Sequence, residues 1–229
     1  MLYRILSITF FILYFGHGSL YGLEIPIRVS SETISIPAPD NFVEVSQALP
    51  NLFAAAQRMI SEENVLLCHF IPTCDLAERI SGREVEYNRF FNVTVEKSNM
   101  GHLCLLSDFS KLKIDLIDYY SKLGVKVEEV FNGKVSRIVE EYGSHMKVEQ
   151  AFPIGVLENS SNCLSIATIT CTNANGKNLR VVSSMNLVFV KGVIVSMNNY
   201  SFFNGEKDFR WIDSTGRKWC KEIHAINSR

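Results

Sequence analysis

Two short segments of the chain gather the side chains that could bind a soft metal ion or perform thiol chemistry. The first contains Cys68, His69 and Cys74, and the second contains His102 and Cys104. Thiolates and imidazoles are ligands that zinc and copper accept readily. Neither segment has a Cys-x-x-Cys or His-Glu-x-x-His spacing, and neighbours in a strand, such as Cys68 and His69, point to opposite faces. A metal- or thiol-dependent enzyme is therefore an alternative hypothesis, and we assign no metal-ligating residue.

Other catalytic arrangements have less support in the sequence. Ser144 and His145 are adjacent, whereas a catalytic triad is assembled by the fold from separated residues. The glycines are scattered and form no phosphate-binding loop. Glutamate pairs at residues 62–63, 128–129 and 140–141 diverge when consecutive residues lie on a helix, so they indicate solvated surface. The sequence predicts no catalytic or cofactor-binding residue and no cofactor, which favours a non-enzymatic function.

The cysteines permit two interpretations. There are six, an even number, and all lie after the N-terminal segment. An even number in an exported protein is compatible with disulfides, and a Cys68–Cys74 bond would close a small loop. Free cysteines are also among the most buried residues, so the same side chains could be core positions in strands. Both interpretations stay open, and the connectivity does not follow from the sequence.

The N-terminus has the order of a secretory signal peptide. Arg4 supplies a positive charge, residues 5–15 form an apolar run, and small residues follow. The run is about eleven residues long, and a membrane-spanning helix needs roughly twenty. We expect residues 1–22 to be a cleaved signal, with cleavage after Gly18 or Gly22, and the protein to be periplasmic or secreted.

The remaining residues, 23–229, number 207 (229 − 22) and suit a single domain. The net charge is −1 and no block of Lys and Arg occurs, so the composition argues against nucleic acid and anionic membranes as partners.

Hydrophobic periodicity predicts alternating strands and helices in the first part of this domain. Apolar residues alternate through residues 25–36 as in a strand, and residues 42–45 form a short strand after a turn at residues 37–41. Apolar positions then recur every three or four residues from Ser46 to Ile60, which predicts a helix. The compact apolar run at residues 65–71 predicts a buried strand.

The middle of the chain contains further helices and one ambiguous stretch. A short helix through Ile80 could be capped by Thr73 or Asp75, and residues 90–95 are typical of a strand. We expect a short extended piece at residues 102–106.

A helix capped by Ser107 or Asp108 follows, ending near Gly124. Residues 125–142 fit a helix, because their apolar stripe keeps its phase, or a hairpin centred on Asn132-Gly133.

The last third predicts an antiparallel meander followed by a helix. Four strands are expected at residues 146–156, 163–172, 179–191 and 193–202. The third is apolar on both faces, which places it in the middle of a sheet that is covered on both sides.

The final helix presents one continuous apolar face, with Trp219 as a core anchor. Its members are Phe209, Ile212, Gly216, Trp219, Cys220, Ile223 and Ile226. The expected fold is therefore α+β: a mainly antiparallel sheet with a C-terminal strand meander, packed against a long central helical segment and a C-terminal helix.

The sequence LVFVKGVIV at residues 187–195, with DFRW at 208–211, Trp219 and Asn227, resembles the C-terminal end of exported bacterial proteins of uncharacterised function. The sequence IPAPDNFV at residues 36–43 is similar to their start. The layout also resembles the α+β sandwich of PsbP-like and Mog1-like proteins. The resemblance implies the fold and carries no site residues, and the six cysteines depart from the cysteine-poor pattern expected of those bacterial proteins.

The sequence therefore predicts an exported, non-enzymatic envelope protein that binds a protein, a lipid or a small ligand. The alternative is a metal- or thiol-dependent envelope enzyme that uses the Cys68/Cys74 and His102/Cys104 region.

Overall fold

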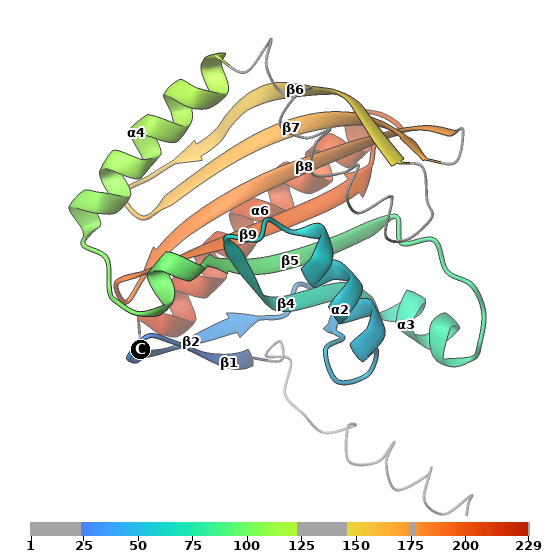
Figure 1. Cartoon of the computed structure of the whole chain (residues 1–229), viewed down its shortest axis with the longest axis horizontal. Coiled ribbons are helices and arrows are strands. Elements are labelled where there is room, and N and C mark those ends of the chain that lie inside the picture. Colours follow the sequence, from blue (N-terminus) through green and yellow to red (C-terminus); the bar gives the residue numbers. More distant parts are fainter. Residues whose placement is uncertain (1–23, 123–145, 175–176, 229) are drawn as a thin grey trace, which may run out of the picture.

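The structure is a computed structural model that describes residues 24–122, 146–174 and 177–228 (Figure 1). Three features expected from the sequence lie outside these residues: the signal segment 1–22, the ambiguous stretch 125–142 and the pair Ser144-His145.

Within the described residues, most strands join one antiparallel sheet of seven strands in the order β3-β4-β5-β9-β8-β7-β6. This main sheet comprises β3 (Phe42–Glu44), β4 (Asn64–Pro72), β5 (Arg89–Glu96), β6 (Met146–Asn159), β7 (Cys163–Ala174), β8 (Lys177–Val190) and β9 (Val193–Phe202). The meander predicted from the last third is confirmed, because β6 to β9 pair consecutively. Lys191 and Gly192 make the turn from β8 to β9 with φ angles of 50° and 74°.

The expectation that residues 179–191 lie in mid-sheet is also confirmed, since β8 lies between β7 and β9. Alternate side chains of the sheet enter two hydrophobic clusters on opposite faces. One face packs Val188 and Val195 against Trp219, and the other packs Leu187 and Ile194 against Phe109.

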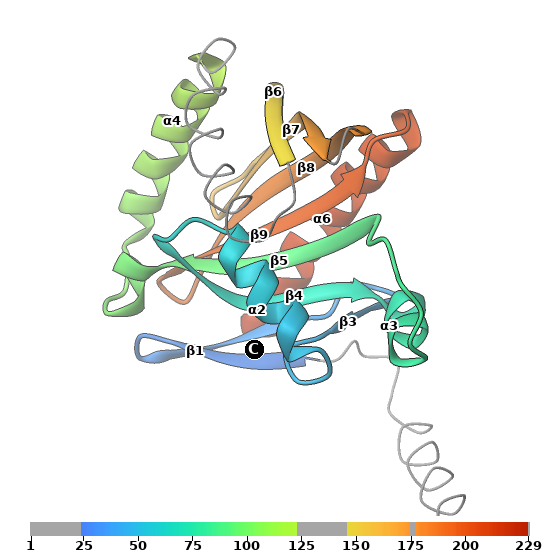
Figure 2. The same cartoon turned by 45° about the vertical axis from the view of Figure 1, so that its right-hand side comes forward.

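Helices cover each face of the main sheet. The helix α6 (Glu206–Asn227) runs behind the strands, and α2 (Pro50–Met59) lies in front of them (Figures 1 and 2). The helix α4 (Leu106–Lys122) buries Phe109 against β7 and β8, on the face opposite α6.

A second, two-stranded sheet pairs β1 (Glu24–Val29) with β2 (Glu32–Pro37). Its Ile34 and Ile36 belong to the same hydrophobic cluster as Trp219 and Ile223 of α6. The α6 helix therefore packs against both sheets, and Trp219 is only 1% exposed, as its predicted role as a core anchor requires.

Three local expectations were wrong in detail. The helix predicted from Ser46 begins at Pro50, since proline suits the first turn of a helix. No side-chain cap begins α3 (Thr73–Ile80), because the Thr73 hydroxyl donates to the Asn41 carbonyl instead. The extended piece expected at residues 102–106 ends earlier, because Leu106 already begins α4, and it joins no strand; a 3₁₀ turn, η1 (Lys97–Met100), precedes it. The α+β fold class is confirmed.

Candidate functional site

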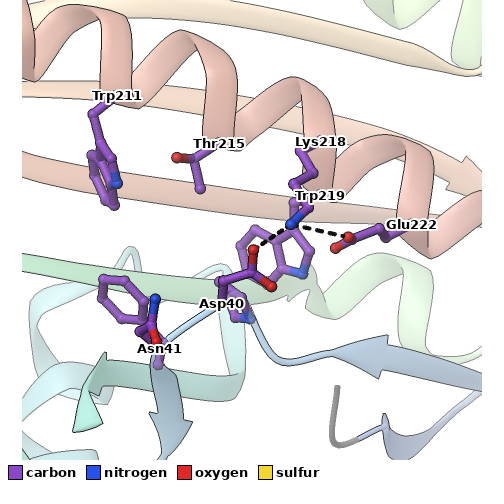
Figure 3. A pocket seen from close by; sticks show the side chains of 9 residues that line it. Asp40, Asn41, Trp211, Thr215, Lys218, Trp219 and Glu222 are labelled. Carbon is purple, nitrogen blue, oxygen red and sulfur yellow. Dashed lines mark hydrogen bonds and ion pairs between the residues drawn. The ribbon is translucent and has the colours of Figure 1, made fainter. Parts of the chain in front are cut away.

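A partly open pocket lies between α6 and the segment that joins β2 to β3 (Figure 3). Its volume is about 200 Å³. Its lining residues are Pro39, Asp40, Asn41, Phe42, Trp211, Thr215, Lys218, Trp219 and Glu222. We refer to it as the tryptophan pocket, because both tryptophans of the chain line it.

Helical geometry explains the wall that α6 supplies. Trp211, Thr215, Lys218 and Glu222 are spaced by three or four residues, so they share one side of the helix. In Figure 3 their side chains descend from α6 toward Asp40 and Asn41.

The opposite wall is a tight turn that is held in place by hydrogen bonds. The Phe42 amide donates to the Pro39 carbonyl at 3.0 Å, and Asn41 has a φ of 63°, which Asn tolerates better than most residues. The backbone amide of Thr73 donates to the Asn41 carbonyl at 2.9 Å, and its hydroxyl donates to the same oxygen at 3.0 Å. The first turn of α3 thus fixes this wall.

Trp219 forms the floor of the tryptophan pocket. Its indole Nε1 donates to the Pro37 carbonyl at 2.7 Å, which satisfies the polar atom of a buried ring. Phe70 and Phe91 meet the ring edge-on, with centroids 5.7 Å and 5.0 Å away. The floor is therefore fixed by the core.

Trp211 is a half-buried side wall with a charged neighbour. The Arg89 guanidinium lies 4.4 Å from the centroid of its ring, and Phe42 lies 6.1 Å away, ring to ring. Arg89 also pairs with Asp208 at 3.1 Å. The hydrogen bond from the Asn204 amide, followed by those from Arg89 and Ser201, lowers the pKa of the Asp208 carboxyl.

An ion-pair cluster borders the pocket. Lys218 pairs with Asp40 and lies 3.6 Å from a carboxylate oxygen of Glu222 (Figure 3). The hydrogen bond to Asp40 is the main cause that raises the pKa of Lys218. Asp40 is 74% exposed, and exposed pairs contribute only about 0–1 kcal/mol to stability, so a partner can displace them at low cost.

The tryptophan pocket has side chains suited to recognition. Its nine lining residues include no histidine, cysteine or serine, and its Lys218 already pairs with Asp40. They offer aromatic faces beside charged side chains, a combination common at binding hot spots.

The sheet separates the side chains of the first candidate segment, which contains Cys68, His69 and Cys74. Cys68 is buried on the α6 side with Phe70, while His69 contacts Asn92 on the other side at 2.7 Å between Nδ1 and Oδ1. Burial, and to a smaller degree Glu44, raises the pKa of the Cys68 thiol. Cys74 is exposed in α3, and the structure contains no Cys68–Cys74 bond.

The second segment lies at the turn after η1. His102 is exposed, and the half-buried Cys104 thiol donates to Asn99 Oδ1 at 3.5 Å. Burial, followed by the nearby Asp108, raises the pKa of this thiol, whereas a nucleophilic cysteine needs a lowered one. Across the described residues, no group of three or more His, Cys, Asp or Glu side chains is placed to hold a metal ion.

Sequence reasoning missed the tryptophan pocket although it singled out several of its residues. The sequence predicts a turn at residues 37–41 and a core position for Trp219, and neither prediction indicates a pocket. A spacing of eight residues between Trp211 and Trp219, with Lys218 and Glu222 on the same side, was the available signal.

Comparisons with known proteins identify no family. No family model and no curated protein matches the chain. Similar solved structures include a point mutant of the protein Mog1, at 13% identity and a TM-score of 0.30, with 90% of each chain covered. They also include the Saccharomyces cerevisiae Ran-binding protein Mog1p, at 11% identity and a TM-score of 0.29, with 91% of this chain and 94% of that chain covered. TM-scores this low support no conclusion about function.

Helices that could cross a membrane are not found among the described residues.

Proposed function

We propose that this chain is a non-enzymatic domain that binds a partner protein through the tryptophan pocket. The observation that carries the proposal is that both tryptophans of the chain line this partly open cavity, next to Phe42 and a stacked arginine. Tryptophan and arginine are the residues most enriched at binding hot spots.

The size of the pocket favours a protein side chain over a free small molecule or a lipid. Its volume is about 200 Å³, whereas small-molecule sites enclose roughly 300–1,000 Å³. One bulky apolar side chain from a partner can enter it while the partner's backbone stays at the rim. The partner segment therefore presents a single aromatic or large aliphatic anchor.

The charges at the rim indicate what flanks that anchor. Asp40 and Glu222 carry two negative charges and Lys218 one positive charge, which leaves a net −1. Lys218 already pairs with both carboxylates, so the surplus is acidic. We expect a lysine or arginine of the partner to lie beside its anchor, where it can pair with Asp40.

A fluorescence titration tests the proposal, because the two tryptophans report from the pocket itself. Peptides that carry an aromatic residue beside lysine or arginine are selected from a displayed library on the purified chain. The best peptide is then titrated while tryptophan emission is followed. We expect a saturable change in emission.

Two variants of α6 make the test specific. Thr215→Phe fills the pocket and should weaken binding at least tenfold. Ser214→Phe adds the same ring at the neighbouring exposed position and should leave the affinity unchanged. Equal affinities for the wild type and Thr215→Phe would contradict the proposal.

The proposal includes export and a single mature domain, residues 23–229, that acts at the cell envelope or outside the cell. Its support is the signal-like order of residues 1–22. The intact mass of the protein recovered from the periplasm or medium tests it. We expect the mass of a chain that begins after Gly18 or Gly22, and an uncleaved chain retained in the cytoplasm would contradict this part.

A further inference from the structure

Two buried thiols meet at the contact between α6 and the main sheet. Cys163 begins β7 and Cys220 lies in the C-terminal half of α6, and their sulfur atoms are 3.1 Å apart. The two side chains are 1% and 2% exposed. Among the described residues, no other two cysteine sulfurs are in contact.

We propose that Cys163 and Cys220 form a disulfide bond when the chain folds in an oxidising environment. A disulfide has a sulfur–sulfur length of about 2.05 Å, so the two atoms need to approach by about 1 Å. The side chains already face each other between two packed elements, so this approach leaves the fold unchanged. The remaining four cysteines stay as thiols: Cys68, Cys74, Cys104 and Cys171.

The chemistry requires a disulfide-bearing oxidant, such as oxidised glutathione or a protein disulfide. One thiol loses a proton, and the thiolate attacks a sulfur of the oxidant to give a mixed disulfide and release a thiol. The second cysteine then attacks its partner's sulfur, which forms the Cys163–Cys220 bond and releases the second thiol. Two electrons pass to the oxidant, which ends as two thiols.

The position of the pair also indicates when the bond forms. In the folded chain, the hydrogen bond to Cys163 and then burial raise the pKa of the Cys220 thiol, so little thiolate exists there. The exchange therefore takes place before α6 docks on β7, while both thiols are still exposed. Once docked, the bond is shielded from reductants.

The bond would close a long loop. The two cysteines are 57 positions apart in the sequence, and cross-links over loops of this length restrict the unfolded chain strongly. For a domain of this size, we expect the chain that is reduced while unfolded and then refolded in reductant to have a Tm lower by roughly 10 °C.

Refolding in a glutathione redox buffer tests the pairing without relying on export. The reduced chain is refolded, its free thiols are alkylated under denaturing conditions, and the intact mass and cysteine peptides are analysed. We expect four of the six cysteines to be alkylated, with Cys163 and Cys220 linked. Six alkylated thiols, or a bond between other cysteines, would overturn the proposal.

Cysteine variants distinguish the effect of the disulfide on the Tm from other effects of substitution on stability. Cys163→Ala and Cys220→Ala should each remove the dependence of the Tm on reductant, while Cys171→Ser should keep it. If the Cys163→Ala protein still loses about 10 °C in reductant, the proposed pair is wrong. If the pair is linked after refolding in vitro but all six cysteines are free in protein recovered from cells, the pairing is supported. Only the proposed export is then contradicted.

Discussion

At the scale of single residues, Gly216 sets how closely α6 approaches the main sheet. A Cβ added at this position would lie 2.8 Å from Asn186 Oδ1. That oxygen accepts a hydrogen bond from the Ser165 hydroxyl, and the Asn186 amide donates to the Met197 carbonyl at 2.8 Å. The cross-strand neighbours Ser184 and Asn199 complete a buried polar cluster. The cluster has no room for a side chain above it.

We predict that Gly216→Ala destabilises the protein by up to about 2 kcal/mol. Alanine favours a helix by about 1 kcal/mol over glycine, but overpacking against Asn186 costs about 1–3 kcal/mol and disturbs the cluster. Chemical denaturation measures the difference. Gly101→Ala, where an added Cβ meets nothing within 4 Å, is the matched control and should be neutral. A more stable Gly216→Ala protein would show that the close approach is absent.

A second prediction at this scale concerns the buried His69. Burial is the main cause that lowers its pKa, so the folded state holds the neutral ring. Below the unfolded pKa of about 6.5, the unfolded chain binds a proton more readily than the folded chain. The free energy of unfolding should therefore fall as the pH drops below about 6.5.

His69→Gln should make the stability less dependent on pH in this range, because glutamine does not titrate. Denaturation of both proteins at pH 7 and pH 5 measures the effect. Identical slopes for the wild type and the variant would contradict the assignment.

At the scale of elements, the side chain of Asn227 bonds the end of α6 to the backbone of β2. Asn227 accepts from the Ser35 amide at 2.9 Å and donates to the Ser35 carbonyl at 2.8 Å. The side-chain amide of Asn227 thus makes the two hydrogen bonds with Ser35 that the backbone of a neighbouring strand would otherwise make. This contact holds the two-stranded sheet against the helix.

We predict that Asn227→Ala costs about 2 kcal/mol and speeds hydrogen exchange of the Ser35 amide. Two backbone groups would lose their partners, and an unsatisfied buried group costs about 1–3 kcal/mol. The neighbouring Ser228→Ala, at an exposed position, is the control. An unchanged exchange rate at Ser35 in Asn227→Ala would mean that another group holds β2.

Helices and strands with a strong hydrophobic periodicity were predictable from the sequence. The buried polar residues within them were not. The meander and α6 follow directly from alternation and the three-to-four spacing. Ser184 and Asn186 were not anticipated as buried, because their partners, Ser165 and Asn199, are on neighbouring strands whose register a single sequence does not reveal. Asn227 likewise has its partner 192 positions away.

At the scale of the whole molecule, the tryptophan pocket exists because distant parts of the chain meet. The turn at residues 39–42 and the wall of α6 at residues 211–222 are separated by most of the sequence. Periodicity placed Trp219 correctly in the core, but it contains no information about which turn would cover the ring. The site therefore needed the structure, whereas the fold class did not.

The indole N–H signals of Trp211 and Trp219 in a ¹H–¹⁵N correlation spectrum test the proposed binding site most directly. The chain has two tryptophans, so a Trp211→Phe variant assigns both signals. Addition of the selected peptide should shift the Trp211 signal saturably in the wild type and leave it in place in Thr215→Phe. A peptide that binds while both indole signals stay unchanged would show that recognition occurs elsewhere.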